Sequence, residues 1–200
     1  MFSFLKKIGM KFLESSLKMT DDDWIKYRAE IYECAKKRQD RLIGNFSEKG
    51  FEYIYDMMIQ NTEFQIIFFI KNFESIFDKA KFTYFEYSIL KSRPNIRASI
   101  YTFSGDKDER FIELETKYEQ FKYVPLIIND KNAFANNFII SDCFRYWLEE
   151  DYTSMKRTSL YNNEPFKACC NFHDYNKVSK LLDYVDHIDN QIKSEWNELN

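Results

Sequence analysis

Two cysteines and a histidine lie close together near the C-terminal end of the sequence, and these residue types can bind a metal ion. Cys169, Cys170 and His173 offer thiolate and imidazole groups, which are ligands that Zn²⁺ prefers. A zinc site needs four ligands, so Cys143 would have to supply another from a distant segment. Adjacent residues on a strand point to opposite faces, so Cys169 and Cys170 can hardly reach one ion. We therefore interpret the cysteines as small buried hydrophobic residues and expect no metal site.

The same residue types could also form a nucleophilic pair. Cys143 with His173 or His187 would have to be adjacent in space, which the spacing in the sequence does not establish. His187 follows Asp183 by four positions on a predicted helix, so these side chains are neighbours and the carboxylate could orient the imidazole. Such a pair is more often an ordinary surface pair.

No stretch of the sequence has the spacing of a known catalytic or cofactor-binding motif. The carboxylates of Glu149, Glu150 and Asp151 are neighbours in sequence and do not converge on one substrate, so we interpret them as a solvated turn. The sequence contains no phosphate-binding glycine loop, dinucleotide fingerprint, nucleophile elbow or HExxH zinc motif. We therefore expect no enzyme activity, no catalytic residues and no cofactor.

The composition is that of one domain, or of one domain with a helical extension. The chain has 200 residues, of which 44% are hydrophobic, and this is enough for a core. Its formal net charge of −3 gives no overall reason to expect nucleic acid or an anionic membrane as a partner. The most apolar run, residues 64–70, is far shorter than the ~20 residues that span a bilayer. Four cysteines without a recognisable signal peptide predict a cytoplasmic protein.

The first part of the sequence has helical patterns. Residues 2–18 place apolar side chains opposite lysines, and such a helix could dock on a membrane surface, on a partner or on its own domain. Thr20 is a good N-cap for a helix toward Leu42. Four basic residues gather near the end of this helix, and we interpret them as a solvated face rather than a nucleic-acid site: Lys36, Lys37, Arg38 and Arg41.

A third helix is predicted after Ser47. The segment from Phe64 to Leu90 is apolar on more than one side and predicts a buried helix, which the proline at position 94 ends. We predict a helical extension over residues 1–61 and a mixed α/β domain over residues 62–200, with one continuous domain as the alternative.

The clearest strand pattern lies in residues 95–115. Apolar and polar residues alternate from Ile96 to Tyr101, which is the period of a half-buried strand. Residues 104–106 include a glycine that can turn the chain, and apolar residues resume from Phe111 to Leu114. We predict a hairpin whose apolar residues share one buried face.

The remaining segments alternate between strands and helices. We predict a short helix that begins at Ser141, a second hairpin from residues 152–161 and 166–172, and a long helix from Asn176. Apolar residues of the last helix recur every three or four positions, so it could pack on the N-terminal helices or pair with a second copy in a homodimer.

This order of elements resembles a GAF domain over roughly residues 62–195. The resemblance rests on the strand 97–101, on its partner 111–115, and on the late pair of strands before a helix. It implies an α+β fold with a central antiparallel sheet flanked by helices, and dimerisation through terminal helices. It also implies a small-molecule pocket, which would be lined by three residues of the middle segment: Asp142, Arg145 and Tyr146.

Two classes of function follow from these observations. The first is a non-enzymatic sensory or regulatory protein that binds a small molecule or another protein and signals through its helices. The second is a protein that binds and neutralises a toxin, as bacterial immunity proteins do. The order of the predicted hairpins favours the first. The acidic balance and the aromatic content of 18% favour the second, because Tyr and Trp are common at interfaces.

Overall fold

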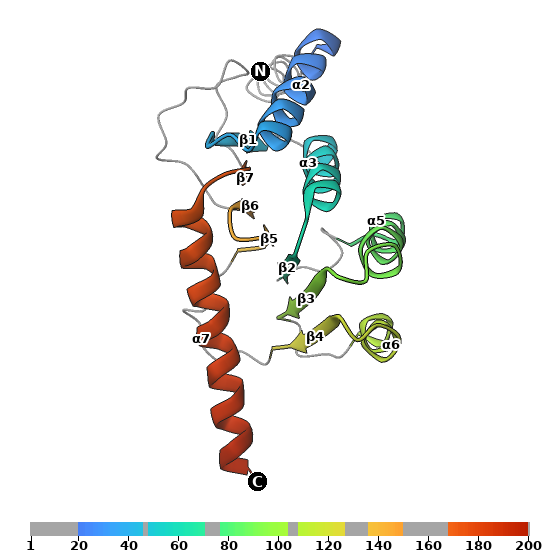
Figure 1. The fold of residues 1–200 in the computed structure, drawn as a ribbon, viewed down its shortest axis with the longest axis vertical. Helices are drawn as coiled ribbons and strands as arrows, with labels where there is room; N and C mark the ends of the chain where they lie inside the picture. The colour runs from blue at the N-terminus through green and yellow to red at the C-terminus, as the bar shows by residue number, and fades with distance from the viewer. Residues whose placement is uncertain are drawn as a thin grey trace, which may run out of the picture.

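The computed structural model describes residues 20–45, 48–70, 77–103, 108–126, 136–149 and 168–199. These residues form a mixed seven-stranded sheet with helices on both faces (Figure 1). The predicted α+β fold with a long C-terminal helix is confirmed. No helix among these residues is both long and apolar enough to span a membrane.

The strands lie in the spatial order β1-β7-β6-β5-β2-β3-β4. Their bounds are Ile43–Asn45 (β1), Gln65–Ile70 (β2), Arg97–Thr102 (β3), Phe121–Pro125 (β4), Phe138–Ser141 (β5), Arg145–Glu149 (β6) and Ala168–Asn171 (β7). β3 pairs in parallel with β2 and with β4, whereas all other pairs are antiparallel. This corrects the expected antiparallel sheet: each connection between the parallel strands contains a helix, which returns the chain to the same end of the sheet.

The helices form two layers that enclose the sheet. Their bounds are Asp21–Lys37 (α2), Glu48–Asn61 (α3), Lys79–Phe85 (α5), the π-helical Glu86–Lys91 (η1), Glu109–Lys117 (α6) and Tyr175–Leu199 (α7). The first five lie on one face of the sheet, and α7 lies on the other (Figure 1). Strand residues alternate between the two cores, so Phe68 packs under the first layer and Phe69 under α7.

α2 begins where its capping residues predict. The Thr20 hydroxyl accepts the backbone N–H of Asp23 at 3.2 Å, and the Asp23 carboxylate accepts the backbone N–H of Thr20 at 3.3 Å. The helix ends at Arg38, whose φ of 50° is left-handed and turns the chain toward β1.

β2 is the central strand that the sequence analysis missed. The buried helix predicted from Phe64 to Leu90 is wrong in its first part, because residues 65–70 form a central strand of the sheet. Five of its six residues are buried, since helices cover both faces. A strand buried on both faces shows no alternation and cannot be distinguished from a buried helix by its pattern.

The hairpin predicted over residues 95–115 is wrong in its second half. β3 forms as predicted, but Phe111 and Leu114 belong to α6, which the Asp108 side chain caps. Both residues are buried, whereas Ile112 is 39% exposed and does not share their face. Apolar residues three positions apart lie on one face of a helix.

The short helix predicted from Ser141 is replaced by a turn and by β6. Ser141 is the last residue of β5, and its hydroxyl lies 3.0 Å from that of Thr62 instead of capping a helix. β7 lies in the second strand of the hairpin predicted over 152–172, whereas the first strand of that hairpin lies outside the described residues. The helix predicted over residues 2–18 also lies outside them.

Helices α2 and α3 pack on the same core as the sheet. Ile31 of α2 and Ile54 of α3 are fully buried in one cluster with Phe68 of β2. β1 pairs with β7 from the other end of the sequence. In the described residues, the predicted helical extension therefore shares its hydrophobic core with the sheet.

We predict that Phe68→Ala lowers the free energy of unfolding by about 3–5 kcal/mol, because it leaves a cavity in the core. Phe68 is fully buried, and its ring centroid lies 4.9 Å from that of Phe77. Urea denaturation followed by circular dichroism measures the change. Phe64 is 66% exposed, so Phe64→Ala is a matched control that should change stability by less than about 0.5 kcal/mol. Equal losses in the two variants would contradict the burial of Phe68.

Candidate functional site

A tight turn between β5 and β6 places a buried carboxylate at one end of the sheet. Asp142 is 1% exposed and has a left-handed φ of 57°, which Asp tolerates better than most residues. Its carboxylate accepts the backbone N–H groups of Glu63, Phe64 and Gln65, at 3.2, 2.8 and 3.1 Å. The side chain thus satisfies the donors between α3 and β2 and determines where the central strand begins.

Arg145 lies beside this carboxylate and is itself 1% exposed. Its Nη1 donates a hydrogen bond to Asp142, while its Nη2 lies 3.6 Å from the carboxylate of Glu63, which is too long for a hydrogen bond. Its Nε finds no hydrogen-bond partner among the described residues. Burial lowers the pKa of Arg145, whereas Asp142 and Glu63 oppose this effect, and arginine stays protonated in proteins. Arg145 is therefore a buried cation with unused donors.

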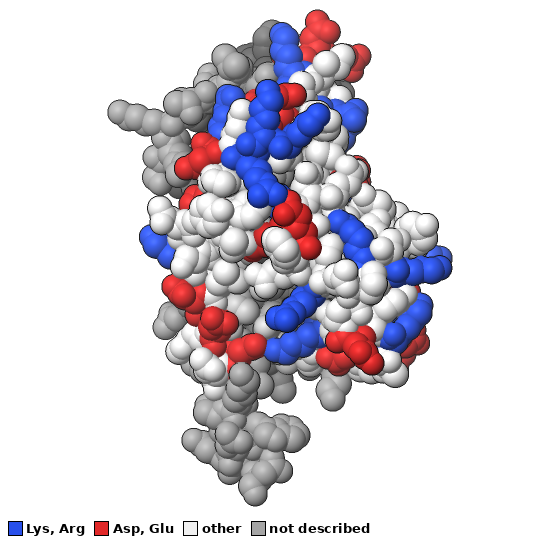
Figure 2. All heavy atoms as spheres, viewed as in Figure 1, with Lys and Arg blue, Asp and Glu red and all other residues white. Residues whose placement is uncertain are grey.

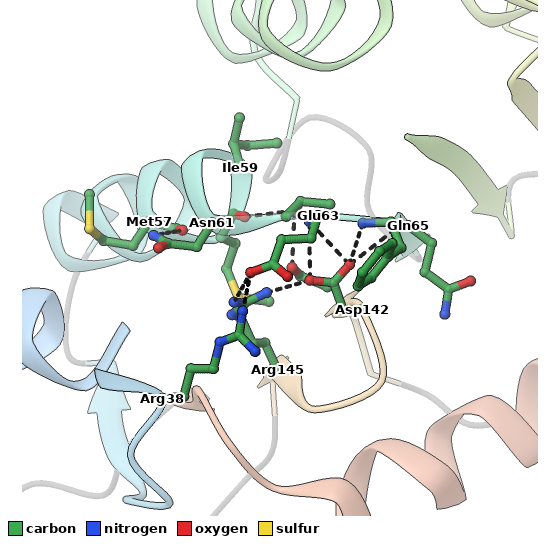
Figure 3. A network of polar contacts seen from close by, with 12 residues as sticks. Arg38, Met57, Ile59, Asn61, Glu63, Gln65, Asp142 and Arg145 are labelled. Atoms are coloured by element: carbon green, nitrogen blue, oxygen red, sulfur yellow. Dashed lines mark hydrogen bonds and ion pairs between the residues drawn. The ribbon is translucent and has the colours of Figure 1, made fainter. Parts of the chain in front are cut away.

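A second arginine reaches the same point from the end of α2 (Figure 3). Arg38 forms an ion pair with the carboxylate of Glu63, and their side chains are 45% and 40% exposed, so this side is open to solvent. The guanidinium carbons of Arg38 and Arg145 lie 5.0 and 4.4 Å from the ring centroid of Phe144. We call these five residues the arginine cluster: Arg38, Glu63, Asp142, Phe144 and Arg145.

A row of cation–aromatic contacts lies along α2 and α3 and leads toward this cluster. Lys49 lies 4.6 Å from the ring centroid of Trp24, and Arg28 lies 4.6 Å from that of Tyr53. Both contacts join residues 25 positions apart, so the two helices run in parallel with a constant register. A further contact lies within α2, and the six residues form what we call the α2–α3 track: Trp24, Arg28, Tyr32, Lys36, Lys49 and Tyr53.

The cations of the track face solvent without carboxylate partners. Arg28, Lys36 and Lys49 are exposed, and Tyr32 is 44% exposed. Within the described part of the chain none of the three cations forms an ion pair. Other basic residues nearby are paired: Lys37 with Glu33, and Arg41 with Glu30. Figure 2 shows Lys and Arg side chains gathered over α2, and acidic ones over α7.

The structure separates the three residues that were expected to line a pocket. Asp142 and Arg145 bind each other in the arginine cluster. Tyr146 follows Arg145 on β6 and lies on the opposite face of the sheet, in the core under α7, where burial raises the pKa of its phenol.

The cysteine and histidine candidates are also separated. Cys169 lies in the core under α7 and Cys170 in the core of the other layer, as strand alternation predicts. Cys143 is exposed in the β5–β6 turn, and His173 is half-buried. The described residues contain no group of three or more His, Cys, Asp or Glu side chains that could hold a metal ion.

The remaining candidates lie on the surface or outside the described residues. Asp183 and His187 are both exposed on α7. Glu149 is exposed at the end of β6, where its carboxylate accepts a hydrogen bond from Asn137. Glu150 and Asp151 lie outside the described residues.

Sequence reasoning missed the track because it treated the basic residues of α2 as a solvated face. A signal was present: aromatic and basic residues alternate at a spacing of four, which places them on one side of a helix. They are Trp24, Arg28, Tyr32 and Lys36. The partners on α3 and the role of Arg38 depend on tertiary packing and leave no such signal.

Comparisons with known proteins show similarity of fold only. No protein-family model matches the chain, and no curated protein matches it. One similar solved structure is NucT from Helicobacter pylori, with a TM-score of 0.51 and 14% identity, covering 75% of this chain and 94% of that chain. Another is TrmBL2, an archaeal chromatin protein with a novel mode of DNA binding, with a TM-score of 0.49 and 12% identity, covering 93% of this chain and 65% of that one.

Two expectations from the sequence are corrected by these comparisons. The absence of motifs suggested a protein without enzyme activity, but NucT is a nuclease, so the fold is one that an enzyme uses. The net charge of −3 suggested no nucleic-acid partner, and we withdraw this expectation, since TrmBL2, one of the similar structures, is itself a DNA-binding protein. The net charge of a chain does not show where charged side chains gather on its surface, as the Lys and Arg side chains do over α2. The GAF resemblance, the sensory and toxin-neutralising roles, the homodimer and the cytoplasmic location stay predictions.

We predict that Asp142→Asn lowers the free energy of unfolding by about 3–5 kcal/mol, because it leaves the charge of Arg145 buried without its closest partner. Asn tolerates the left-handed backbone and keeps one acceptor oxygen for the backbone N–H groups, but its NH₂ group cannot accept the hydrogen bond from Arg145. Chemical denaturation measures the effect. Glu149→Gln is a control that removes an exposed carboxylate near the other end of β6 and should cost less than about 0.5 kcal/mol. An equally small loss for Asp142→Asn would contradict the role assigned to this carboxylate.

Proposed function

We propose that this protein binds single-stranded nucleic acid along the α2–α3 track. The observation that supports the proposal is the row of three exposed cations, each of which lies over an aromatic ring and none of which forms an ion pair with a carboxylate of the described residues. Proteins that bind single strands combine a positively charged surface with aromatic side chains on which bases stack. The track offers both kinds of group side by side.

The dimensions and charges of α2 give the proposed site a direction. The helix rises about 1.5 Å per residue, so the distance from Trp24 to Arg38 is roughly 20 Å, enough for several nucleotides. Three aspartates occupy the first turn of α2, and their charge would repel phosphates at that end. The opposite end leads to the arginine cluster, so a bound strand would extend from Trp24 toward Arg38.

The likeness to NucT is a likeness of fold, and one fold can serve many functions. The proposal therefore rests on the side chains of the track. These side chains project from two helices whose inner faces are buried in the core, so the backbone positions that carry them are fixed before a ligand arrives.

Fluorescence anisotropy with a labelled single-stranded oligonucleotide tests the proposed function. We expect the triple variant Arg28→Ala/Lys36→Ala/Lys49→Ala to bind more weakly and to reduce the slope of log affinity against log salt by about 2, because three phosphate contacts at ~0.7 each are lost. The control is Lys79→Ala/Lys117→Ala/Lys122→Ala, which removes the same charge from α5, α6 and β4, where all three residues are exposed. Equal weakening by both triple variants would show binding by overall charge and contradict the proposed site.

A second variant separates stacking from charge. Tyr32→Ala removes an exposed ring and should weaken binding about tenfold, which corresponds to the loss of one stacked base. The salt slope should stay unchanged, because no cation is lost. Tyr87→Ala is the matched control, since Tyr87 is also exposed and also lies beside a lysine, but on η1. An unchanged affinity for Tyr32→Ala would argue against base stacking on α2.

A further inference from the structure

We propose that Arg38 and Arg145 form a phosphate-binding site that the carboxylate of Glu63 occupies in the unliganded protein. A phosphate group displaces this carboxylate when it binds. The inference deepens the proposed function, because it takes the phosphate to be one of a nucleic-acid strand that lies on the α2–α3 track.

The hydrogen bonds of Arg145 are the first support. A guanidinium has five N–H donors, and buried donors are nearly always satisfied. Arg145 is 1% exposed, yet within the described residues it makes one hydrogen bond, to Asp142, and a loose 3.6 Å ion pair with Glu63. Its Nε is buried and has no hydrogen-bond partner in the part of the chain that the structure describes. A buried cation that is only partly satisfied has donors left for a further acceptor.

The shared position of Glu63 is the second support. Its Oε1 atom faces the Nη2 atoms of both Arg38 and Arg145, so one carboxylate oxygen serves two cations (Figure 3). A phosphate group carries more acceptor oxygens and can accept hydrogen bonds from both guanidinium groups. The ligand that suits this pair of arginines better than a carboxylate is therefore a phosphate group.

The two carboxylates of the cluster differ in their freedom to leave. The side chain of Asp142 is fully buried and is held by three backbone N–H groups, so it remains with Arg145. The Glu63 side chain is 40% exposed. The backbone N–H of Glu63 donates to Asp142, and this hydrogen bond does not restrain the Glu63 side chain. Rotation of the Glu63 side chain into solvent would open the site without a change in the backbone.

Phe144 fixes the orientation of the site. Its ring lies against both guanidinium groups, and the ring centroids of His173 and Tyr175 lie 5.6 and 5.5 Å away. Both charged groups therefore rest on one aromatic surface, and their Nη2 atoms face Glu63, whose side chain is partly open to solvent.

The test is a titration of inorganic phosphate into the full chain, followed by the ³¹P chemical shift or by calorimetry. We expect Glu63→Gln to bind phosphate about tenfold more tightly than the natural sequence, because the competing charge is gone. Arg38→Ala should bind phosphate at least tenfold more weakly than the natural sequence. The affinity of Arg38→Lys should lie between that of Arg38→Ala and that of the natural sequence. Thermal melts verify that the variants are folded, and Arg145 is left intact because its substitution would disrupt the core.

Glu52→Gln is the matched control, since Glu52 is an exposed carboxylate on α3 away from the cluster. Phosphate affinity that is unchanged or weaker in Glu63→Gln, or equally increased in Glu52→Gln, would overturn the inference. This outcome is separate from failure of the proposed function, which the track variants and the oligonucleotide decide. Tighter phosphate binding by Glu63→Gln without tighter oligonucleotide binding would overturn the assignment of the phosphate to nucleic acid.

Discussion

Both the sheet and the arginine cluster depend on the carboxylate of Asp142, which connects the start of β2 to the start of β6. It holds the backbone at the start of β2 and the guanidinium of Arg145 at the start of β6. Arg145 in turn lies against Phe144, on which Arg38 at the end of α2 also rests. A buried ion pair adds little net stability, because desolvation offsets the attraction, but it defines geometry. Its main effect here is to place the end of α2 beside the central strand.

The layer above the sheet divides structural and surface roles between different sides of the same helices. Tyr27 and Ile31 of α2 are buried and secure the helix to the core. Trp24 and Tyr53 pack only partly against that core, so their rings remain available to the cations beside them. Rings fixed on one side and open on the other make a rigid surface, and binding to it requires little ordering of side chains.

The elements that follow from short-range patterns could be predicted from the sequence, and those that follow from packing could not. Thr20 caps α2 and the residues after Ile96 form β3 because these signals lie within a few positions. β2 gave no alternation because both of its faces are covered. α6 was predicted as a strand because its three apolar residues, Phe111, Ile112 and Leu114, are too few to distinguish the period of a helix from that of a strand. The arginine cluster depends on hydrogen bonds between residues 79 positions apart, such as Glu63 and Asp142, for which a single sequence contains no signal.

The pairing of β1 with β7 has a consequence for how the protein is made. Among the described strands β1 lies at the edge of the sheet and its neighbour is β7, with Ile43 opposite Cys170. At a synthesis rate of roughly 5–20 residues per second, β1 waits on the order of ten seconds for its partner to leave the ribosome. During this time its backbone donors and acceptors are unpaired, and an exposed strand edge can pair with another chain. Only three residues long, β1 is a short edge, which limits that risk while the nascent chain is incomplete.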